Sequence, residues 1–135
     1  MTDLKTLREE ASKSRELSYS PYSKFAVGAV IITKDGRIFR GANIENASYP
    51  LSICAERTAI FNAYLAGVRQ EEIEVLALIA DSPAIVSPCG ACRQVMSEML
   101  APTTPVVLFT TGGKQKETTV AELLPLAFNK GNMAC

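Results

Sequence analysis

The residues best suited to chemistry in this sequence are cysteines. Cys54 lies in the stretch "CAERTAIF", and Cys89 and Cys92 form a C-x-x-C pair in "SPCGACRQ", in a chain that contains no histidine. In a reducing cytosol such a pair points to metal binding or to redox chemistry. Three sulfur ligands suit Zn²⁺, and a catalytic zinc site leaves its fourth position to water, whereas a structural site closes with four protein ligands. Without histidine, and with Cys135 expected to be a frayed free thiol, water is the best candidate for the fourth ligand.

A glutamate accompanies the first cysteine. Glu56 follows Cys54 by two residues and would lie in the first turn of a helix that begins there. A water on catalytic zinc requires a general acid or base within hydrogen-bond distance, and a carboxylate can supply it. Taken alone, Glu56 is typical of a solvated glutamate at a helix N-terminus, and Cys54 of a small buried residue. The combination of a carboxylate with three thiols favours a catalytic metal site.

Helices and strands must position these residues, and the hydrophobic pattern predicts them. Helices are expected from Thr2 or Asp3 to before Pro21, over 54–67, over 89–100 and from Thr119 through Phe128, and strands over 25–33, 37–46, 73–80 and 105–111. The dipeptide Asp35-Gly36 predicts a hairpin turn between the first two strands. A hairpin followed by two alternations of strand and helix predicts one mixed sheet with helices on both faces, a three-layer α/β/α sandwich. Cys54 and Cys89 would then open two helices, whose dipoles lower thiol pKa values.

The composition limits the function classes. The chain has 135 residues, 14 basic and 14 acidic, with 47% hydrophobic residues, which predicts a single globular domain over residues 1–135. The absence of a basic run argues against a nucleic-acid partner. No stretch has the apolar length of a membrane span or a signal sequence, so we expect a soluble cytoplasmic protein without a membrane partner.

Four stretches of the sequence closely resemble the small, homotetrameric, zinc-dependent cytidine deaminases. They are "YSPYSKFAVGA", "GANIENASYP", "CAERTAIFNA" and "SPCGACRQVMSE", in the order and spacing of that family and over nearly the whole chain. The two-part motif matches the zinc deaminase signature of His or Cys, x, Glu and then Pro-Cys-x-x-Cys, here in an all-cysteine version. The segment "NIEN" narrows the resemblance to deaminases of nucleosides. The implied fold is cytidine deaminase-like, with a mixed five-stranded sheet.

The resemblance implies a reaction and a metal. Cys54, Cys89 and Cys92 would bind one Zn²⁺ per subunit, and a zinc-activated hydroxide would attack position 4 of the base. Glu56 would protonate ring nitrogen 3 and carry the proton to the leaving amine. The expected reaction is the hydrolytic deamination of cytidine and 2′-deoxycytidine to uridine and 2′-deoxyuridine plus ammonia, a step of pyrimidine salvage.

Two polar residues are implied to hold the sugar. Asn43 and Glu45 would bind the ribose hydroxyls, and residues two apart on a strand face the same side. Without the resemblance, the same pair reads as a polar strand end that runs into a loop. A carboxylate at the sugar would also repel a phosphate group, which favours an unphosphorylated nucleoside as the substrate.

Aromatic residues are implied to hold the base. Phe25 would pack against it, and Phe128 would come from a neighbouring subunit of a homotetramer, although either residue alone is typical of a core. The backbone of Ala55 would meet the edge of the pyrimidine. Tyr49 would lie near the pocket or at a subunit contact.

The charge of the proposed metal site raises a further question. Zinc with three thiolates is formally anionic, which weakens its ability to acidify water compared with a site of neutral histidine ligands. Arg57 follows Glu56 directly, and the resemblance places an arginine against the sulfurs here. We expect Arg57 to donate hydrogen bonds to the thiolates, although an exposed helix arginine is the simpler interpretation.

Three other functions fit part of the pattern. The same chemistry could act on another small aminopyrimidine compound, such as a blasticidin-type nucleoside or a nucleotide. An editing deaminase of RNA or DNA would need a positive channel, which the neutral charge disfavours. A noncatalytic zinc-stabilised module would need a closed four-ligand site and no carboxylate in the pocket.

Overall fold

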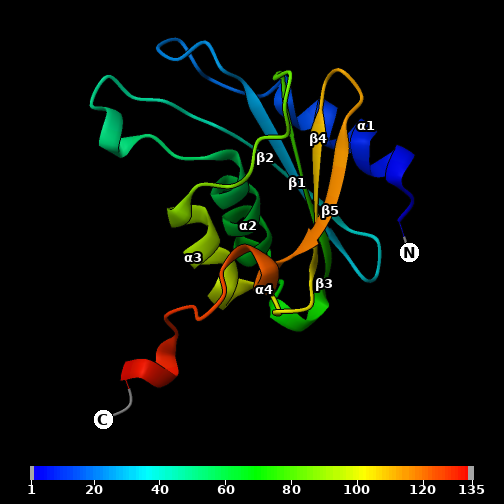
Figure 1. The fold of residues 1–135 in the computed structure, drawn as a ribbon, viewed down its shortest axis with the longest axis vertical. Coiled ribbons are helices and arrows are strands. Elements are labelled where there is room, and N and C mark those ends of the chain that lie inside the picture. The colour runs from blue at the N-terminus through cyan, green and yellow to red at the C-terminus, as the bar shows by residue number, and fades with distance from the viewer. Residues whose placement is uncertain (1, 134–135) are drawn as a thin grey trace.

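Four strand segments predicted from the sequence and one polar segment form the strands of one sheet. The strands are β1 Val27–Thr33, β2 Ile38–Ala42, β3 Ile73–Ala80, β4 Pro105–Thr110 and β5 Gln115–Thr119. They pair in the order β2-β1-β3-β4-β5, and β3 and β4 are parallel while the other neighbouring pairs are antiparallel. The sheet is therefore mixed and five-stranded, as expected. The computed structural model that shows this describes residues 2–133 (Figure 1).

Helices cover both faces of the sheet and make a three-layer sandwich (Figure 1). They are α1 Leu4–Arg15, α2 Ala55–Leu65, α3 Gly90–Met99 and α4 Val120–Leu123, with short 3-10 turns at Tyr49–Leu51, Gln70–Glu72 and Lys130–Met133. Successive residues of β1 point to opposite faces, as the period of a strand requires. Val30 packs in a cluster with Leu7 of α1, whereas Ile31 packs in a cluster with Ile60 of α2 and Met96 of α3. The predicted α/β/α architecture is confirmed.

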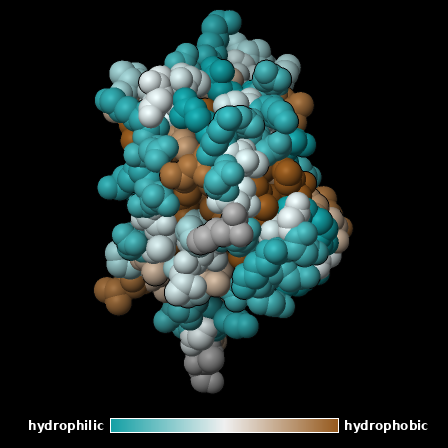
Figure 2. Space-filling model, turned by 90° about the vertical axis from the view of Figure 1, so that its right-hand side faces the viewer, coloured by the Kyte–Doolittle hydropathy of each residue, from teal (hydrophilic) through white to brown (hydrophobic). Residues whose placement is uncertain are grey.

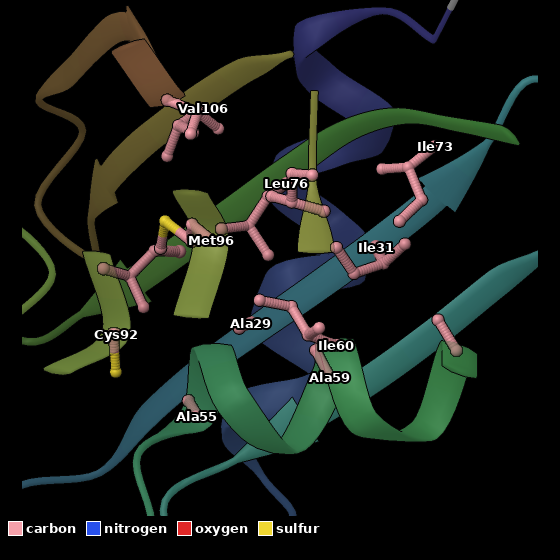
Figure 3. Packing of buried hydrophobic residues seen from close by; sticks show 14 of the residues in the cluster. Ala29, Ile31, Ala55, Ala59, Ile60, Ile73, Leu76, Cys92, Met96 and Val106 are labelled. Atoms are coloured by element: carbon pink, nitrogen blue, oxygen red, sulfur yellow. The ribbon is translucent and has the colours of Figure 1, made fainter. Parts of the chain in front are cut away.

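Small residues bring α2 very close to the sheet. Ala55 and Ala59 have no exposed surface, and Figure 3 shows them on α2 facing the strands. A Cβ atom added to Gly41 of β2 would lie 2.3 Å from the backbone nitrogen of Ala59 and 2.5 Å from the carbonyl oxygen of Ala55. Only glycine fits at this contact, which fixes the height of the α2 N-terminus above the sheet.

The outer surface of α1 is polar. Its N-cap is Asp3, whose carboxylate accepts a 2.7 Å hydrogen bond from the backbone nitrogen of Thr6, as the sequence predicted. The helix ends at Arg15, so Leu17 is not part of its apolar face and is 62% exposed. Figure 2 shows this side of the molecule, which is mostly hydrophilic with a few separate hydrophobic patches.

Most element boundaries agree with the sequence prediction to within a few residues. The strand over 73–80 is confirmed at both ends, and the hairpin turns at Gly36 with φ of 88°, a conformation that glycine adopts without strain. The first strand begins at Val27 and not at Phe25, and the second ends at Ala42, before Asn43. Three residues expected on strands to contact substrate, Phe25, Asn43 and Glu45, therefore lie on connecting segments.

The C-terminal prediction was wrong in two respects. The pattern did not locate β5, whose sequence "QKETT" is largely exposed. The last helix begins after Thr119 as expected, and Thr119 caps it by accepting from the backbone nitrogen of Glu122, but it ends at Leu123 and does not reach Phe128. Leu124 has φ of −143° and ψ of 78°, because the residue before a proline avoids helical conformation and Pro125 follows. Cys135 lies outside the described residues.

Candidate active site

Three thiols meet where two helices begin. Cys54 is the N-cap of α2, Cys89 is the N-cap of α3, and Cys92 lies in the first turn of α3. The Sγ atoms of Cys54 and Cys89 are 3.8 Å apart, and all three Sγ atoms lie within 4.8 Å of one another. Four tetrahedral sulfur ligands about 2.3 Å from zinc lie about 3.8 Å apart. The three thiols therefore fit one zinc ion in both chemistry and spacing.

The thiols are electrostatically unequal. Hydrogen bonding with the Cys92 thiol, assisted by Arg57, lowers the pKa of Cys54 to about 5. The same pairing with Cys54, together with burial, raises the pKa of Cys92. The Nη2 of Arg57 lies 3.5 Å from Cys54 Sγ and donates to it. Arg57 therefore directs this donor at the sulfur cluster.

A buried carboxyl group lies beside the thiols. Glu56, in the first turn of α2, is 4% exposed. Burial is the main cause that raises the pKa of Glu56, and the charge of Cys54 acts in the same direction. A carboxyl group with a raised pKa holds a proton closer to neutral pH than an exposed glutamate does, which is what proton transfer requires.

These groups line a cavity of about 460 Å³, a size that suits a small organic ligand. Its walls come from the segment between α1 and β1, the segment after β2, the N-terminus of α2 and the loop before α3. The described lining residues are Ser23, Phe25, Val27, Asn43, Glu45, Tyr49, Pro50, Ser52, Ile53, Cys54, Ala55, Glu56, Arg57, Leu78, Val86, Ser87 and Cys89. Cys92 is fully buried behind this wall, so two thiols face the cavity and the third supports them.

Asn43 and Glu45, the predicted sugar-binding pair, line the cavity and also form hydrogen bonds that hold its wall in place. Glu45 Oε1 accepts hydrogen bonds from the backbone nitrogens of Tyr22 and Ser23, both at 3.0 Å, and Oε2 accepts from the Ser23 hydroxyl. The bond from the Ser23 side chain is the main cause that lowers the pKa of Glu45. Asn43 Oδ1 accepts from the backbone nitrogen of Val27 at 2.9 Å, and Asn43 Nδ2 donates to the Phe25 carbonyl at 2.7 Å.

The structure brings together two of the three base-contact candidates, Phe25 and Ala55, with Tyr49, which was expected near the pocket or at a subunit contact. Phe25, Tyr49 and Ala55 line the cavity, with Ala55 fully buried and Tyr49 57% exposed. Phe128 does not reach the cavity of its own chain; it lines a different hollow beside α4 and is 57% exposed. Its placement leaves the ring free to contact something outside this chain.

Several lining residues were missed by the sequence analysis. Ser23, Val86 and Ser87 lie in loops and have no periodicity that would single them out, and Leu78 belongs to a strand that was identified only as core. A signal for Ser23 was present in the quoted block "YSPYSKFAVGA". Its connection to Glu45 could not be inferred without the fold.

Comparison with known proteins agrees with this geometry. Residues 1–108 match the family model described as the cytidine and deoxycytidylate deaminase zinc-binding region. The cytidine deaminase of Sporosarcina psychrophila is 49% identical over 98% of this chain and 96% of its own length, and that of Halalkalibacterium halodurans is 51% identical over 97% and 98%. The chain belongs to the cytidine deaminase family. The all-cysteine cluster of this family member lies wholly inside the matched zinc-binding region.

Solved structures of cytidine deaminases have the same fold as this family member. The crystal structure of cytidine deaminase from Burkholderia pseudomallei is 47% identical and covers 94% of this chain and all of that chain, with a TM-score of 0.92. The cytidine deaminase from Mycobacterium tuberculosis is 32% identical over 96% of this chain and 99% of that chain, with a TM-score of 0.80. The predicted fold class is thus confirmed by relatives as well as by topology. Within residues 2–133, each helix is too short or too polar to cross a membrane.

Proposed function

We propose that this enzyme hydrolyses cytidine and 2′-deoxycytidine to uridine and 2′-deoxyuridine, with release of ammonia. The close cytidine deaminase relatives that cover nearly the whole chain support the reaction class. The observation that carries the proposal is one cavity lined by Glu56 together with Cys54 and Cys89 of the thiol cluster. A noncatalytic zinc module would have no use for a buried carboxyl group at its metal.

Cys54, Cys89 and Cys92 would hold the zinc ion. When bound, zinc lowers the pKa of water to about 7 and so supplies a nucleophile at neutral pH. Glu56 would take one proton from the attacking water as its oxygen adds to carbon 4 of the base, and would give this proton to ring nitrogen 3. It would then take the second proton, from the new hydroxyl on carbon 4, and give it to the exocyclic amine. The carbon–nitrogen bond breaks, the carbon–oxygen double bond forms, and the amine leaves as ammonia. The raised pKa of Glu56 suits both the acceptance and the donation of a proton.

The rest of the cavity would bind a neutral nucleoside. Phe25 would pack on the base, and the Ala55 backbone would meet its edge. Tyr49, which lines the cavity and is 57% exposed, would lie near the substrate or at a subunit contact. Asn43 and Glu45 already make hydrogen bonds to the cavity wall. Their remaining donor and acceptor positions would bind the sugar hydroxyls. Glu45 has a lowered pKa and is anionic at neutral pH, so it would repel the phosphate of a nucleotide.

Arg57 would offset the negative charge of the metal site. Three thiolates around Zn²⁺ leave a formal charge of about −1, and Arg57 Nη2 already donates to Cys54 Sγ at 3.5 Å. Its Nε atom is buried and has no partner among the described residues, so the guanidinium has a further donor near the cluster. Arg57 would therefore draw electron density from the sulfurs and help zinc to acidify water.

The enzyme would act as a homotetramer. The tetramer is the state that the family resemblance implies, and Leu51, 74% exposed, and Phe128, 57% exposed, are available to a subunit contact. Phe128 would complete the cavity of a neighbouring subunit. Mixing inactive Glu56→Gln and Phe128→Ala proteins and allowing subunit exchange should then restore part of the activity. A fully active monomer in sedimentation would contradict the tetramer.

Residues 1–135 would form a single domain that works in the cytoplasm. The domain is supported by the two core clusters, which lie on opposite faces of one sheet. The location is supported by the three thiols, because cysteines stay reduced and available to metal in the cytosol. Limited proteolysis and cell fractionation test these two points.

An ultraviolet assay tests the function directly. Cytidine, 2′-deoxycytidine, cytosine, a blasticidin-type nucleoside and deoxycytidine monophosphate are supplied in turn, and zinc is quantified in the same preparation. We expect turnover of the two nucleosides and one zinc per subunit. Turnover of the nucleotide alone, or of none of the five with zinc fully bound, would overturn the proposal.

A further inference from the structure

The loop between β3 and α3 forms part of the active-site wall. Val86 and Ser87 line the cavity, and Cys89 follows them directly. Ile85 packs against the core and is only partly buried, and Pro88 is buried. The position of the Cys89 thiol opposite Cys54 therefore depends on how this loop is held.

The first residue of the loop, Asp81, accepts a hydrogen bond from the Thr111 hydroxyl, and a single side chain supplies the hydrogen bonds that hold residues 84–88 from outside the loop. Arg93, one residue after Cys92, donates from Nε to the Pro88 carbonyl at 2.8 Å and from Nη2 to the Ser87 hydroxyl at 2.9 Å. Among residues 2–133, no other residue outside the loop hydrogen-bonds to residues 84–88. Arg93 is therefore the one described side chain outside the loop that holds residues 84–88 by hydrogen bonds.

The same guanidinium connects the loop to a second segment. Its Nη1 donates to the Leu123 carbonyl at 2.8 Å, and Leu123 is the last residue of α4. One planar group thus satisfies three acceptors in two segments that are far apart in the sequence. An arginine can do this because its five donors are fixed in one plane, whereas a lysine offers a single ammonium on a flexible stem.

We propose that Arg93 is a positioning residue, which braces the Cys89 loop against the end of α4 and so keeps Cys89 in place for metal binding. With Arg93 shortened or made flexible, residues 84–88 lose their hydrogen bonds to the rest of the chain and keep only the packing of Ile85 and Pro88, so the Cys89 thiol samples positions away from Cys54. The metal part of this inference does not require that the proposed reaction be correct. A second consequence, that Val86 and Ser87 keep the shape of the nucleoside cavity, rests on the proposed function.

Zinc release from the purified holoenzyme tests the proposal. Zinc is transferred to a chromogenic chelator and the rate is compared for wild type, Arg93→Lys and Arg69→Lys. Arg69 is a matched control, because its Nη1 also donates to two backbone carbonyls, those of Tyr64 and Val68, but it does not line the cavity. We expect Arg93→Lys to release zinc about 10-fold to 100-fold faster, the usual effect of losing a group that orients a metal ligand, and Arg69→Lys to behave as wild type.

Two further measurements separate positioning from general stability. In Arg93→Lys the KM for cytidine should rise while kcat per bound zinc stays near wild type. Ser87→Ala, which leaves Arg93 intact, should speed zinc release less, and its effect should not add to that of Arg93→Lys because both remove the same bond.

A folded Arg93→Lys protein that releases zinc at the wild-type rate would overturn the proposal, whether or not any variant deaminates cytidine. Faster release from Arg69→Lys to the same extent would also overturn it. If Arg93→Lys does not fold, Ser87→Ala becomes the deciding variant, and an unchanged release rate there would refute the inference.

Discussion

Replacing Glu56 by glutamine removes the proposed proton carrier and leaves the rest of the site unchanged. Glutamine has the same shape as glutamate and is neutral, so it fits a position that is 4% exposed without adding a buried charge. Among the described residues, the cavity lining has one other carboxyl group, that of Glu45. Both oxygens of Glu45 are bonded to residues 22 and 23, and its pKa is lowered, so it is a poor substitute as a proton carrier. General acid–base catalysis contributes about 10²–10⁴-fold; with no replacement carrier, we expect a loss near 10⁴-fold, which is about 5 kcal/mol of barrier.

The assay follows the ultraviolet change of cytidine at saturating substrate, with kcat expressed per bound zinc. Glu56→Gln should keep its zinc, because the three thiols are untouched. Glu45→Gln is the matched control: it removes the other cavity carboxylate and should raise KM while leaving kcat per zinc within about tenfold, since its role is in binding. A Glu56→Gln enzyme with full zinc and a kcat within tenfold of wild type would refute the assignment of Glu56 as the proton carrier.

Three other changes test the supports of the site. Arg57→Ala should lower zinc affinity or turnover by about 10-fold or more, measured by metal titration and the same assay; normal values for both would remove Arg57 from its role. Glu10 is held by Lys13 and Arg40, whose hydrogen bonds keep its pKa below the usual value although burial opposes this. The Glu10 ion pairs therefore stabilise the fold at neutral pH, and Glu10→Gln should lower the free energy of unfolding by about 1 kcal/mol at pH 7. That loss should disappear as the pH falls through the lowered pKa of Glu10; an equal loss at all pH values in urea unfolding would contradict it. Gly41→Ala should lower the free energy of unfolding by at least about 2 kcal/mol, because its Cβ would overlap the α2 backbone, and wild-type stability in urea would refute that contact.

The metal cluster could be predicted from the sequence because its parts carry local signals. Cys54 and Cys89 directly precede helix-forming stretches, and cysteines at two helix N-termini can converge if the helices lie side by side on one face of a sheet. Glu56 follows from its place in the first turn of the same helix. The pair Asn43 and Glu45 was expected on a strand, and although β2 ends at Ala42, the extended backbone continues and both side chains still face the cavity.

Other features depend on contacts between distant segments and leave no local signal. The loop at Ser23, which forms part of the cavity wall, is hydrogen-bonded to Glu45. The two residues are 22 positions apart, and no periodicity of the sequence predicts this contact. Strand β5 was not located because its sequence is polar and it is an edge strand, so the hydrophobic alternation that marks half-buried strands is missing. The hydrophobic pattern extends the last helix to Phe128, but Leu124 precedes Pro125 and leaves the helical conformation, so α4 ends at Leu123.

The distribution of charge explains why the cavity suits a neutral nucleoside. Among the described residues that line it, Arg57 is the only cation, and it is directed at the Cys54 sulfur. Its charge is therefore used at the metal end and is not available to a ligand. At the other wall Glu45 is held ionised by Ser23 and its neighbours, so a phosphate with a charge of about −1.5 to −2 would meet a carboxylate without a compensating lysine or arginine. A neutral sugar avoids this repulsion and offers hydroxyl donors to the same carboxylate, so the groups that make the cavity negative also select an uncharged substrate.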